Sequence, residues 1–316
     1  MKKRWLIAAA VLVLIGALLF AGAMLSVGWD FNALGEKTET VALEIPEPFR
    51  NIAIRSDTEE IRFLPAEDGV CRVTFREQEK ERHTAAVENG TLMIGKTDAR
   101  QGTELLSFSF DSPEITLYLP QREYGALTIE ESTGGVMIPK DFAFESIRID
   151  ASTGDVDCSA CVSGEARIAL STGDIRMEDV SAGALDLTVS TGKVTVRGAV
   201  CTGDVHVGVS TGKAVLHGLR CKNLRSEGTT GDLAMEKVLA EGSMTIERST
   251  GKVRFDACDA ADFAVKTGTG DVTGTLLSEK VFLTQTDTGR VDVPKTVSGG
   301  KCEITTGTGD IQISVR

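Results

Sequence analysis

The chain has 316 residues, a formal net charge of −12 and 41% hydrophobic residues. This acidity disfavours nucleic acid and anionic lipid surfaces as binding partners. Thirty-three glycines, seven prolines and only 5% aromatic residues fit a repetitive all-β protein better than a chain folded around one globular core.

The N-terminus carries a long apolar stretch. Residues 5–29 contain no charge and follow Lys2, Lys3 and Arg4. Such a stretch is long enough to cross a bilayer, and the basic flank places the N-terminus in the cytoplasm. We therefore predict a single-pass membrane anchor over residues 1–29. A signal peptide cleaved after Ala23 remains the alternative. Either reading exports the rest of the chain, whose net charge without the three basic residues is about −15.

Residues 30–40 are predicted to be a linker, and residues 41–130 an irregular β-rich N-terminal cap. Short runs rich in β-branched and aromatic residues predict strands there. They cover residues 41–45, 51–56, 59–65, 70–77, 91–97, 115–120 and 126–130. Residues 49–65 already match a degenerate first repeat, and the polar segment 77–104 predicts hairpins and loops. A cap is expected because the end of a repeat stack otherwise exposes its core.

Residues 131–316 are dominated by one short repeat. A Thr-Gly pair recurs ten times at intervals of 19 or 20 residues, which is the signature of a repeat architecture. The threonines are Thr133, Thr153, Thr172, Thr191, Thr211, Thr230, Thr250, Thr269, Thr288 and Thr308. We call each repeat a rung and number its positions from the threonine.

Apolar residues recur at fixed positions in each rung. The fourth and sixth positions carry Val156, Ile175 and Met177, Val194 and Val196, Leu233 and Met235, Val253 and Phe255, Val291 and Val293, and Ile311 and Ile313. The ninth carries Cys161, Val180, Ala199, Leu219, Val238, Cys258 and Leu277. A further pair falls at the fourteenth and sixteenth positions, for example Leu185 and Leu187, and shifts by one residue in 20-residue rungs. Apolar residues two apart predict half-buried strands rather than helices.

Stacking equivalent strands of successive rungs gives parallel sheets with about 4.8 Å between rungs. Glycine after each threonine suits a tight corner. We therefore predict an all-β fold, a parallel β-solenoid (β-helix) of about ten rungs that is capped at its N-terminal end and preceded by one transmembrane helix. Its strands would form a rod on the order of 50 Å long.

Charged residues occupy the third position, and hydroxyl residues the first. Asp155 lies over Asp174, whereas signs alternate from Asp232 onward. We expect this column to form weak surface ion pairs, because two carboxylates are too few for a calcium site. We also expect the hydroxyl groups of the corner threonines and of the serines before them to satisfy backbone groups of the turn.

We expect the seven cysteines to pack as small apolar side chains rather than to form a redox or metal site. Cys158 and Cys161 form a Cys-x-x-Cys pair, but Cys161 falls on the predicted core column, where free cysteine behaves as a small hydrophobe. Cys201 and Cys221 share one position in consecutive rungs, so stacking brings their Cα atoms to roughly 5 Å. A disulfide and two packed thiols are both compatible with that spacing. The three histidines form no ligand pattern.

The N-terminal anchor, the segments ITLYLP and LTIEESTGGV, and the repeated STGDV and STGKV motifs resemble the DUF4097 family, which carries the label "putative adhesin". The resemblance covers nearly all of the chain outside the anchor. It implies a β-solenoid on the bacterial cell envelope and brings no catalytic residues with it.

No nucleophile motif, phosphate loop or cleft-building insertion is found, so we expect no enzyme and assign no catalytic, cofactor-binding or metal-binding residues. The sequence favours a membrane-anchored adhesion or scaffold module with an unidentified protein or peptide partner. The alternative is an envelope-stress sensor that binds cationic peptides or a membrane protein. A glycan-active enzyme ranks third. Residues 308–316 are expected to form an open end that docks a partner, stacks weakly on another copy of the chain, or frays.

Overall fold

The computed structural model describes residues 2–26, 38–78, 82–96 and 113–316. Most of the predicted linker, residues 30–37, lies outside the described residues. So do residues 79–81 and 97–104 of the segment predicted to form hairpins and loops.

Helix α1 spans Lys2–Ser26. Over the described residues, no helix meets the combined length and hydropathy of a membrane span. The predicted transmembrane helix is therefore not confirmed. Residues 27–29 of the predicted anchor lie outside the described part of the chain.

The rest of the described chain consists of β-strands and the turns and loops that join them. The N-terminal strands are β1 (Thr38–Glu44), β2 (Asn51–Ser56), β3 (Glu60–Pro65), β4 (Arg72–Gln78), β5 (His83–Glu88), β6 (Thr91–Lys96) and β7 (Glu114–Leu119). The repeat region begins with β8 (Glu123–Thr133), β9 (Val136–Ile138), β10 (Ala143–Thr153), β11 (Val156–Cys158), β12 (Cys161–Glu178), β13 (Ser181–Arg197), β14 (Val200–Cys201), β15 (Val205–His217), β16 (Arg220–Cys221) and β17 (Leu224–Thr230). It ends with β18 (Leu233–Glu236), β19 (Leu239–Ala240), β20 (Ser243–Thr250), β21 (Val253–Cys258), β22 (Asp262–Thr269), β23 (Val272–Leu276), β24 (Lys280–Thr288), β25 (Val291–Asp292), β26 (Gly300–Thr308) and β27 (Ile311–Val315).

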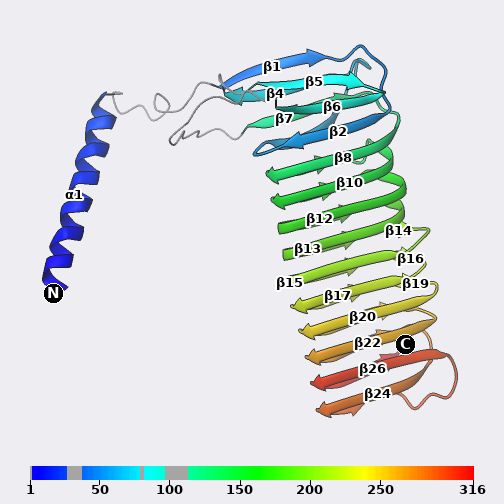
Figure 1. Ribbon diagram of the computed structural model, residues 1–316. Coiled ribbons are helices and arrows are strands. Elements are labelled where there is room, and N and C mark those ends of the chain that lie inside the picture. The colour runs from blue at the N-terminus through cyan, green and yellow to red at the C-terminus, as the bar shows by residue number, and fades with distance from the viewer. Residues whose placement is uncertain (1, 27–37, 79–81, 97–112) are drawn as a thin grey trace.

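Equivalent strands of neighbouring rungs pair in parallel, which confirms the predicted β-solenoid (Figure 1). Strands β12 and β13 pair from Ala166 with Leu185 to Glu178 with Arg197. The extra residue of the 20-residue rung that starts at Thr191 falls in the turn between β14 and β15, as predicted.

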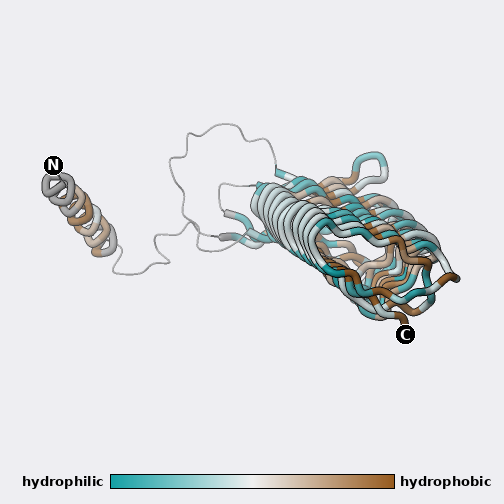
Figure 2. The backbone as a smooth tube through the Cα atoms, turned by 90° about the horizontal axis from the view of Figure 1, so that it is seen from below, coloured by the Kyte–Doolittle hydropathy of each residue, from teal (hydrophilic) through white to brown (hydrophobic). Residues whose placement is uncertain are grey.

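The apolar columns line the interior of the stack. Ile175, Val194 and Val253 are fully buried, as are Leu187 and Ile246 of the second strands. Each Gly after Thr has a positive φ, and a Cβ on Gly173 or Gly192 would collide with the carbonyl oxygen of the preceding rung's glycine. Only glycine allows this approach. Figure 2 shows the stacked corners as a pale strip along one edge.

The ninth position does not always face the core. In five rungs the eighth residue has a positive φ and the ninth side chain is buried, as with Ala257 and Cys258. Two rungs lack that left-handed residue, and their eighth residues, Ala160 and Leu276, are buried instead. Cys161 and Leu277 are therefore exposed, and the prediction that they face the core is wrong.

The N-terminal end does not follow chain order. Strands β2 and β3 pair in parallel with β8 and β9, so residues 49–65 do form a rung. Strands β6 and β7 then pair on the outer side of β2 and β3. Antiparallel strands cover this outer rung, with β5 on β6, β4 on β7 and β1 on β4.

The C-terminal end departs from chain order in the same way. Strands β26 and β27, the last in the sequence, lie between β22 and β23 on one side and β24 and β25 on the other (Figure 1). Ile311 and Ile313 are buried, whereas Val291 of the preceding rung is 44% exposed. The expectation that residues 308–316 form the open end is therefore wrong, because the outermost rung is made by residues 280–292.

Candidate functional site

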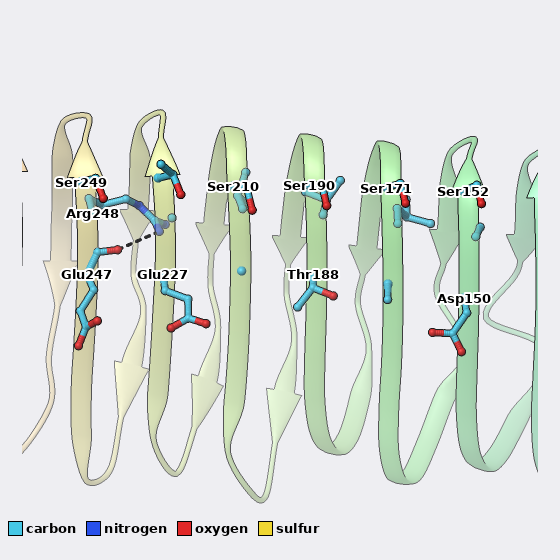
Figure 3. Close-up of a pocket in the computed structure, with 18 of the residues that line it drawn as sticks. Asp150, Ser152, Ser171, Thr188, Ser190, Ser210, Glu227, Glu247, Arg248 and Ser249 are labelled. Atoms are coloured by element: carbon cyan, nitrogen blue, oxygen red, sulfur yellow. Dashed lines mark hydrogen bonds between the residues drawn. The ribbon is translucent and has the colours of Figure 1, made fainter.

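A long groove runs along the outer surface beside the stacked corners, with a cavity volume of about 980 Å³. The last three residues before each corner threonine line it, over seven successive rungs. These residues are 150–152, 169–171, 188–190, 208–210, 227–229, 247–249 and 266–268, and Glu131 lines one end. Figure 3 shows a row of serines and, parallel to it, a second row that includes Asp150, Thr188, Glu227 and Glu247. We call this feature the hydroxyl groove.

The serine row supplies exposed hydroxyl groups at the spacing of the rungs. Its members are Ser152, Ser171, Ser190, Ser210, Thr229 and Ser249. Among the described residues, none of these hydroxyls has a hydrogen-bond partner. The corner backbone is instead bonded between rungs, as where the amide of Gly154 donates to the carbonyl of Thr172 at 3.0 Å. The expectation that these hydroxyls satisfy turn groups is therefore wrong, and they are available to a ligand.

The second row is neutral in the middle of the hydroxyl groove, is acidic on both sides of that middle, and ends in the basic Lys266. Ala169, Thr188 and Gly208 lie between Asp150 on one side and Glu227 on the other. Glu227 is held in place by Arg225, 2.8 Å away, and by a hydrogen bond with a ring nitrogen of His206 at 3.2 Å. Arg225 and His206 lower the pKa of this carboxyl despite its partial burial, so Glu227 presents a negative charge at neutral pH.

Arg248 is the buried cation of the hydroxyl groove. Apart from Glu131 at one end, it occupies a column that otherwise holds apolar or small residues, and it is only 5% exposed. Its guanidinium donates to Ser226 Oγ at 2.8 Å, and glycine at position 228 leaves the room that it fills. Burial lowers the pKa of Arg248 to about 10, still well above neutrality. A basic residue that interrupts this column is visible in the sequence, but we did not predict a role for it.

A second buried polar cluster joins the cap to the first rungs. The ring of His83 lies between two carboxylates, with Nδ1 2.7 Å from Glu77 and Nε2 3.1 Å from Glu59. Burial alone would lower the pKa of His83, but hydrogen bonds to Glu59 and Glu77 outweigh it and raise that pKa. Lys96 lies 3.0 Å from Glu59. No sequence motif marks this cluster, because its members come from separate segments of the chain, with Glu59 lying 24 residues before His83.

Glu131 lies beside that cluster, at one end of the hydroxyl groove. Its Oε1 accepts a hydrogen bond from the amide of Thr133, but its Oε2 is buried with no partner among the described residues. Burial raises the pKa of Glu131 to about 7, and the negative charge of Glu59 adds to this effect. Glu131 therefore titrates near neutral pH.

The third-position charges form local pairs, but in a different order from the one predicted. Arg176 reaches three carboxylates, those of Asp155, Asp157 and Asp174, within 3.3 Å. It neutralises the stacked pair Asp155 and Asp174. Each of these two aspartates also accepts the backbone amide of the next rung, at 2.9 and 3.0 Å.

The alternation of sign predicted from Asp232 onward fails at the C-terminal end. The exchange of the last two rungs stacks Asp271 on Asp310, whose amide donates to the Asp271 carboxylate at 3.1 Å. Arg290 then pairs with Asp310 at 3.1 Å. A chain-order stack would have placed Arg290 between these two aspartates.

The cysteines are all free thiols, and six of the seven are buried. Burial raises the pKa of Cys201 to about 11 and that of Cys221 to about 12, so both stay protonated at neutral pH. Within the described residues no cluster of three or more histidine, cysteine, aspartate or glutamate side chains could hold a metal ion.

Fold and groove together define a β-solenoid repeat protein with one long polar groove. The chain belongs to the DUF4097 family, whose model, described as Toastrack DUF4097, matches residues 49–213. A comparison with curated proteins gives no match.

Among solved structures, a "putative adhesin" from Parabacteroides merdae is similar at 10% identity and a TM-score of 0.51, over 87% of this chain and 96% of its own. Another, from Bacteroides fragilis, is similar at 14% identity and a TM-score of 0.45, over 89% of this chain and 98% of its own. At 10% identity, the likeness to the Parabacteroides merdae protein shows a shared fold alone.

Proposed function

We propose that the protein is a non-catalytic adhesion or interaction module of the bacterial cell envelope, and that the hydroxyl groove binds an extended polymer. The observation that carries this proposal is the row of unpartnered hydroxyls, one on each of six successive rungs. A polymer with hydrogen-bonding groups at regular intervals, such as a glycan strand, can bond to one rung after another. Many weak, equivalent contacts then add up along one rigid surface.

A non-catalytic role fits the chemistry of the hydroxyl groove. A serine becomes a nucleophile when a neighbouring base accepts its proton. In the described part of the chain, no base lies within hydrogen-bond distance of the serine row. The hydroxyls therefore favour binding over bond cleavage, and a glycan-active enzyme remains the third candidate.

The proposal places the solenoid outside the cytoplasm, tethered through residues 1–29. Its support is the uncharged stretch after Lys2, Lys3 and Arg4, because basic residues before such a stretch favour a cytoplasmic N-terminus. Fractionation of cells that express the full chain tests the tether. Recovery in the membrane fraction with an intact N-terminus is expected, and a soluble exported form that begins after Ala23 contradicts it.

The alternative function is an envelope-stress sensor that binds cationic peptides. The acidic residues on either side of the neutral centre favour it, because Asp150, Glu227 and Glu247 would attract a basic peptide. Binding of this kind weakens steeply with added salt, whereas hydrogen bonding to a neutral glycan changes little.

Co-sedimentation of the full chain, in detergent, with insoluble peptidoglycan tests the main proposal. Ser190→Trp places a bulky ring in the middle of the hydroxyl groove and is expected to lower the bound fraction at least several-fold. Ser181→Trp is the control, since Ser181 is equally exposed but lies outside the groove. Equal binding by both variants and the unaltered chain would sink the proposal. Binding of a lysine-rich peptide alone, lost in added salt, would favour the sensor.

A further inference from the structure

Strand β24 forms an exposed edge at the C-terminal end of the solenoid. It pairs with β26 on one side, and no described strand pairs with its other side. At the opposite end of the molecule, the antiparallel strands β1, β4 and β5 cover the outer rung. An edge of this kind presents free backbone N–H and C=O groups to any strand that approaches it.

The edge lacks the features that usually prevent pairing. Residues 281–288 hold no proline and a single charged residue, Asp287. Lys280, at the start of the strand, is buried and paired with Asp259 at 2.9 Å. Charges, prolines and short length normally protect exposed edges. On the nine-residue β24, only Asp287 supplies such a charge, and Thr296 hydrogen-bonds only the carbonyl of Lys280, the first residue of the strand.

Apolar side chains gather around this edge. Leu283 is 52% exposed, and Val297, in the segment between β25 and β26, is 95% exposed. Phe282 packs only partly against the core. A partner strand would cover apolar surface as well as complete the backbone hydrogen bonds.

The sequence of the edge is complementary to itself in one antiparallel register. Placing Thr284 opposite Thr284 of a second copy sets Asp287 across from the uncharged Val281, so the two aspartates stay apart. Arg290 lies just beyond one end of the strand and Glu279 just before the other, so the antiparallel register brings each of them near the oppositely charged residue of the second copy. Arg290 pairs with Asp310 at 3.1 Å but keeps a largely exposed side chain, and Glu279 is exposed as well, so opposite charges come together at both ends of the pair.

We propose that two copies of the chain associate through antiparallel pairing of β24 with β24, about a two-fold axis at Thr284. The joint makes one continuous rod of two solenoids with both N-terminal ends pointing outward, and it uses the same surface patch on each copy. The proposal is independent of the hydroxyl groove, because the groove lies along the side of the rod and β24 closes its end.

The first test measures the mass of the full chain in detergent by light scattering coupled to size exclusion. A dimer is expected, and Leu283→Lys should halve the mass because a lysine on the edge opposes pairing. Val200→Lys is the matched control: Val200 is 51% exposed, but its strand β14 is paired on both sides. A monomeric unaltered chain, or equal masses for the two variants, would overturn the proposal.

The second test probes the register by cross-linking. Cys161, the exposed cysteine, is first replaced by serine. In that background Thr284→Cys is expected to give a disulfide-linked dimer on mild oxidation, because the proposed register brings the two Cα atoms to about 5 Å. Thr245→Cys, partly buried on the paired strand β20, should stay monomeric. Equal cross-linking of both variants would rule out the register.

Discussion

The backbone at the eighth position of a rung decides which side chain enters the core. A left-handed residue there reverses the chain direction within one residue, so that the ninth side chain points inward. Asp179, Lys237 and Ala257 adopt φ between 51° and 53° at this position. The conformation costs a residue with a Cβ roughly 1–2 kcal/mol. The sequence shows only that some rungs carry glycine there, so the outward side chain of Cys161 could not be predicted from the repeat.

Replacing Ala257 by glycine should therefore stabilise the protein. Glycine adopts the left-handed conformation without the clash, and we expect a gain of about 0.5–1 kcal/mol. Ala160→Gly provides the matched control, because Ala160 holds the same position in a rung without the left-handed residue. That variant should lose about 1 kcal/mol. Urea unfolding measures both, and a loss of stability for both variants would contradict the role of the eighth position.

The buried carboxyl of Glu131 makes stability depend on pH near neutrality. The pKa of Glu131 is raised from its ordinary value of 4.5 to about 7 in the folded state. Its contribution to the free energy of unfolding is therefore fully present below pH 4.5 and is lost as the pH rises through 7. Protonated His83 acts in the same direction, because its raised pKa gives stability that is lost at alkaline pH. Glu59 acts in the opposite direction and weakens the fold only when acid protonates it.

Glu131→Gln should be more stable than the unaltered chain at pH 8.5, by about 2 kcal/mol, and nearly equal at pH 5. The neutral amide avoids the buried charge and its oxygen still accepts from the Thr133 amide. Glu130→Gln, a change at the exposed neighbour that pairs with Arg55, should show no such difference between the two pH values. Melting curves of both variants at the two pH values measure the effect, and parallel behaviour of the two would count against it.

At the scale of the strand, apolar pairs two residues apart were sufficient to predict the fold. Val194 and Val196 are fully buried, as are Leu185 and Leu187 of the second strand of the rung before. Within a strand, successive side chains point to opposite faces, so the period of two determines which residues face the core. The turns between strands carry no such period, and both mispredicted ninth positions directly follow a turn or a strand end, Cys161 as the first residue of β12 and Leu277 just after β23. The hydroxyl groove was missed for a related reason, because nothing in the sequence says whether an exposed serine bonds its own turn.

Adjacent residues on one strand should accordingly differ in their tolerance of change. Val194→Asp buries a charge between stacked apolar neighbours and should cost several kcal/mol. Lys193→Ala removes a side chain that points outward, and the backbone amide of residue 193 still donates to Asp174. This substitution should therefore cost under about 0.5 kcal/mol. Thermal unfolding distinguishes them, and similar melting temperatures would show that the register is wrong.

At the scale of the whole molecule, the order of the rungs in space could not be read from the chain. The rungs resemble one another, so the last one satisfies its apolar positions equally well inside the stack or at its end. The structure inserts residues 300–315 between two earlier rungs and leaves residues 280–292 outermost. A similar exchange occurs at the N-terminal end with β2 and β6. Each end is thus closed by a rung that is not the first or last in the chain.

Because of this exchange, we expect a substitution in the last rung of the chain to destabilise the protein more than the equivalent substitution in the rung before it. Ile311 and Val291 occupy the same position in neighbouring rungs and pair directly with each other, but Ile311 is buried and Val291 is 44% exposed. Ile311→Asp should destabilise the protein by several kcal/mol, since its carboxylate would lie unpaired between two rungs. Val291→Asp should cost under about 1 kcal/mol, because water reaches the outermost rung. Urea unfolding of both variants provides the measurement; a larger loss for Val291→Asp would mean that the rungs stack in chain order.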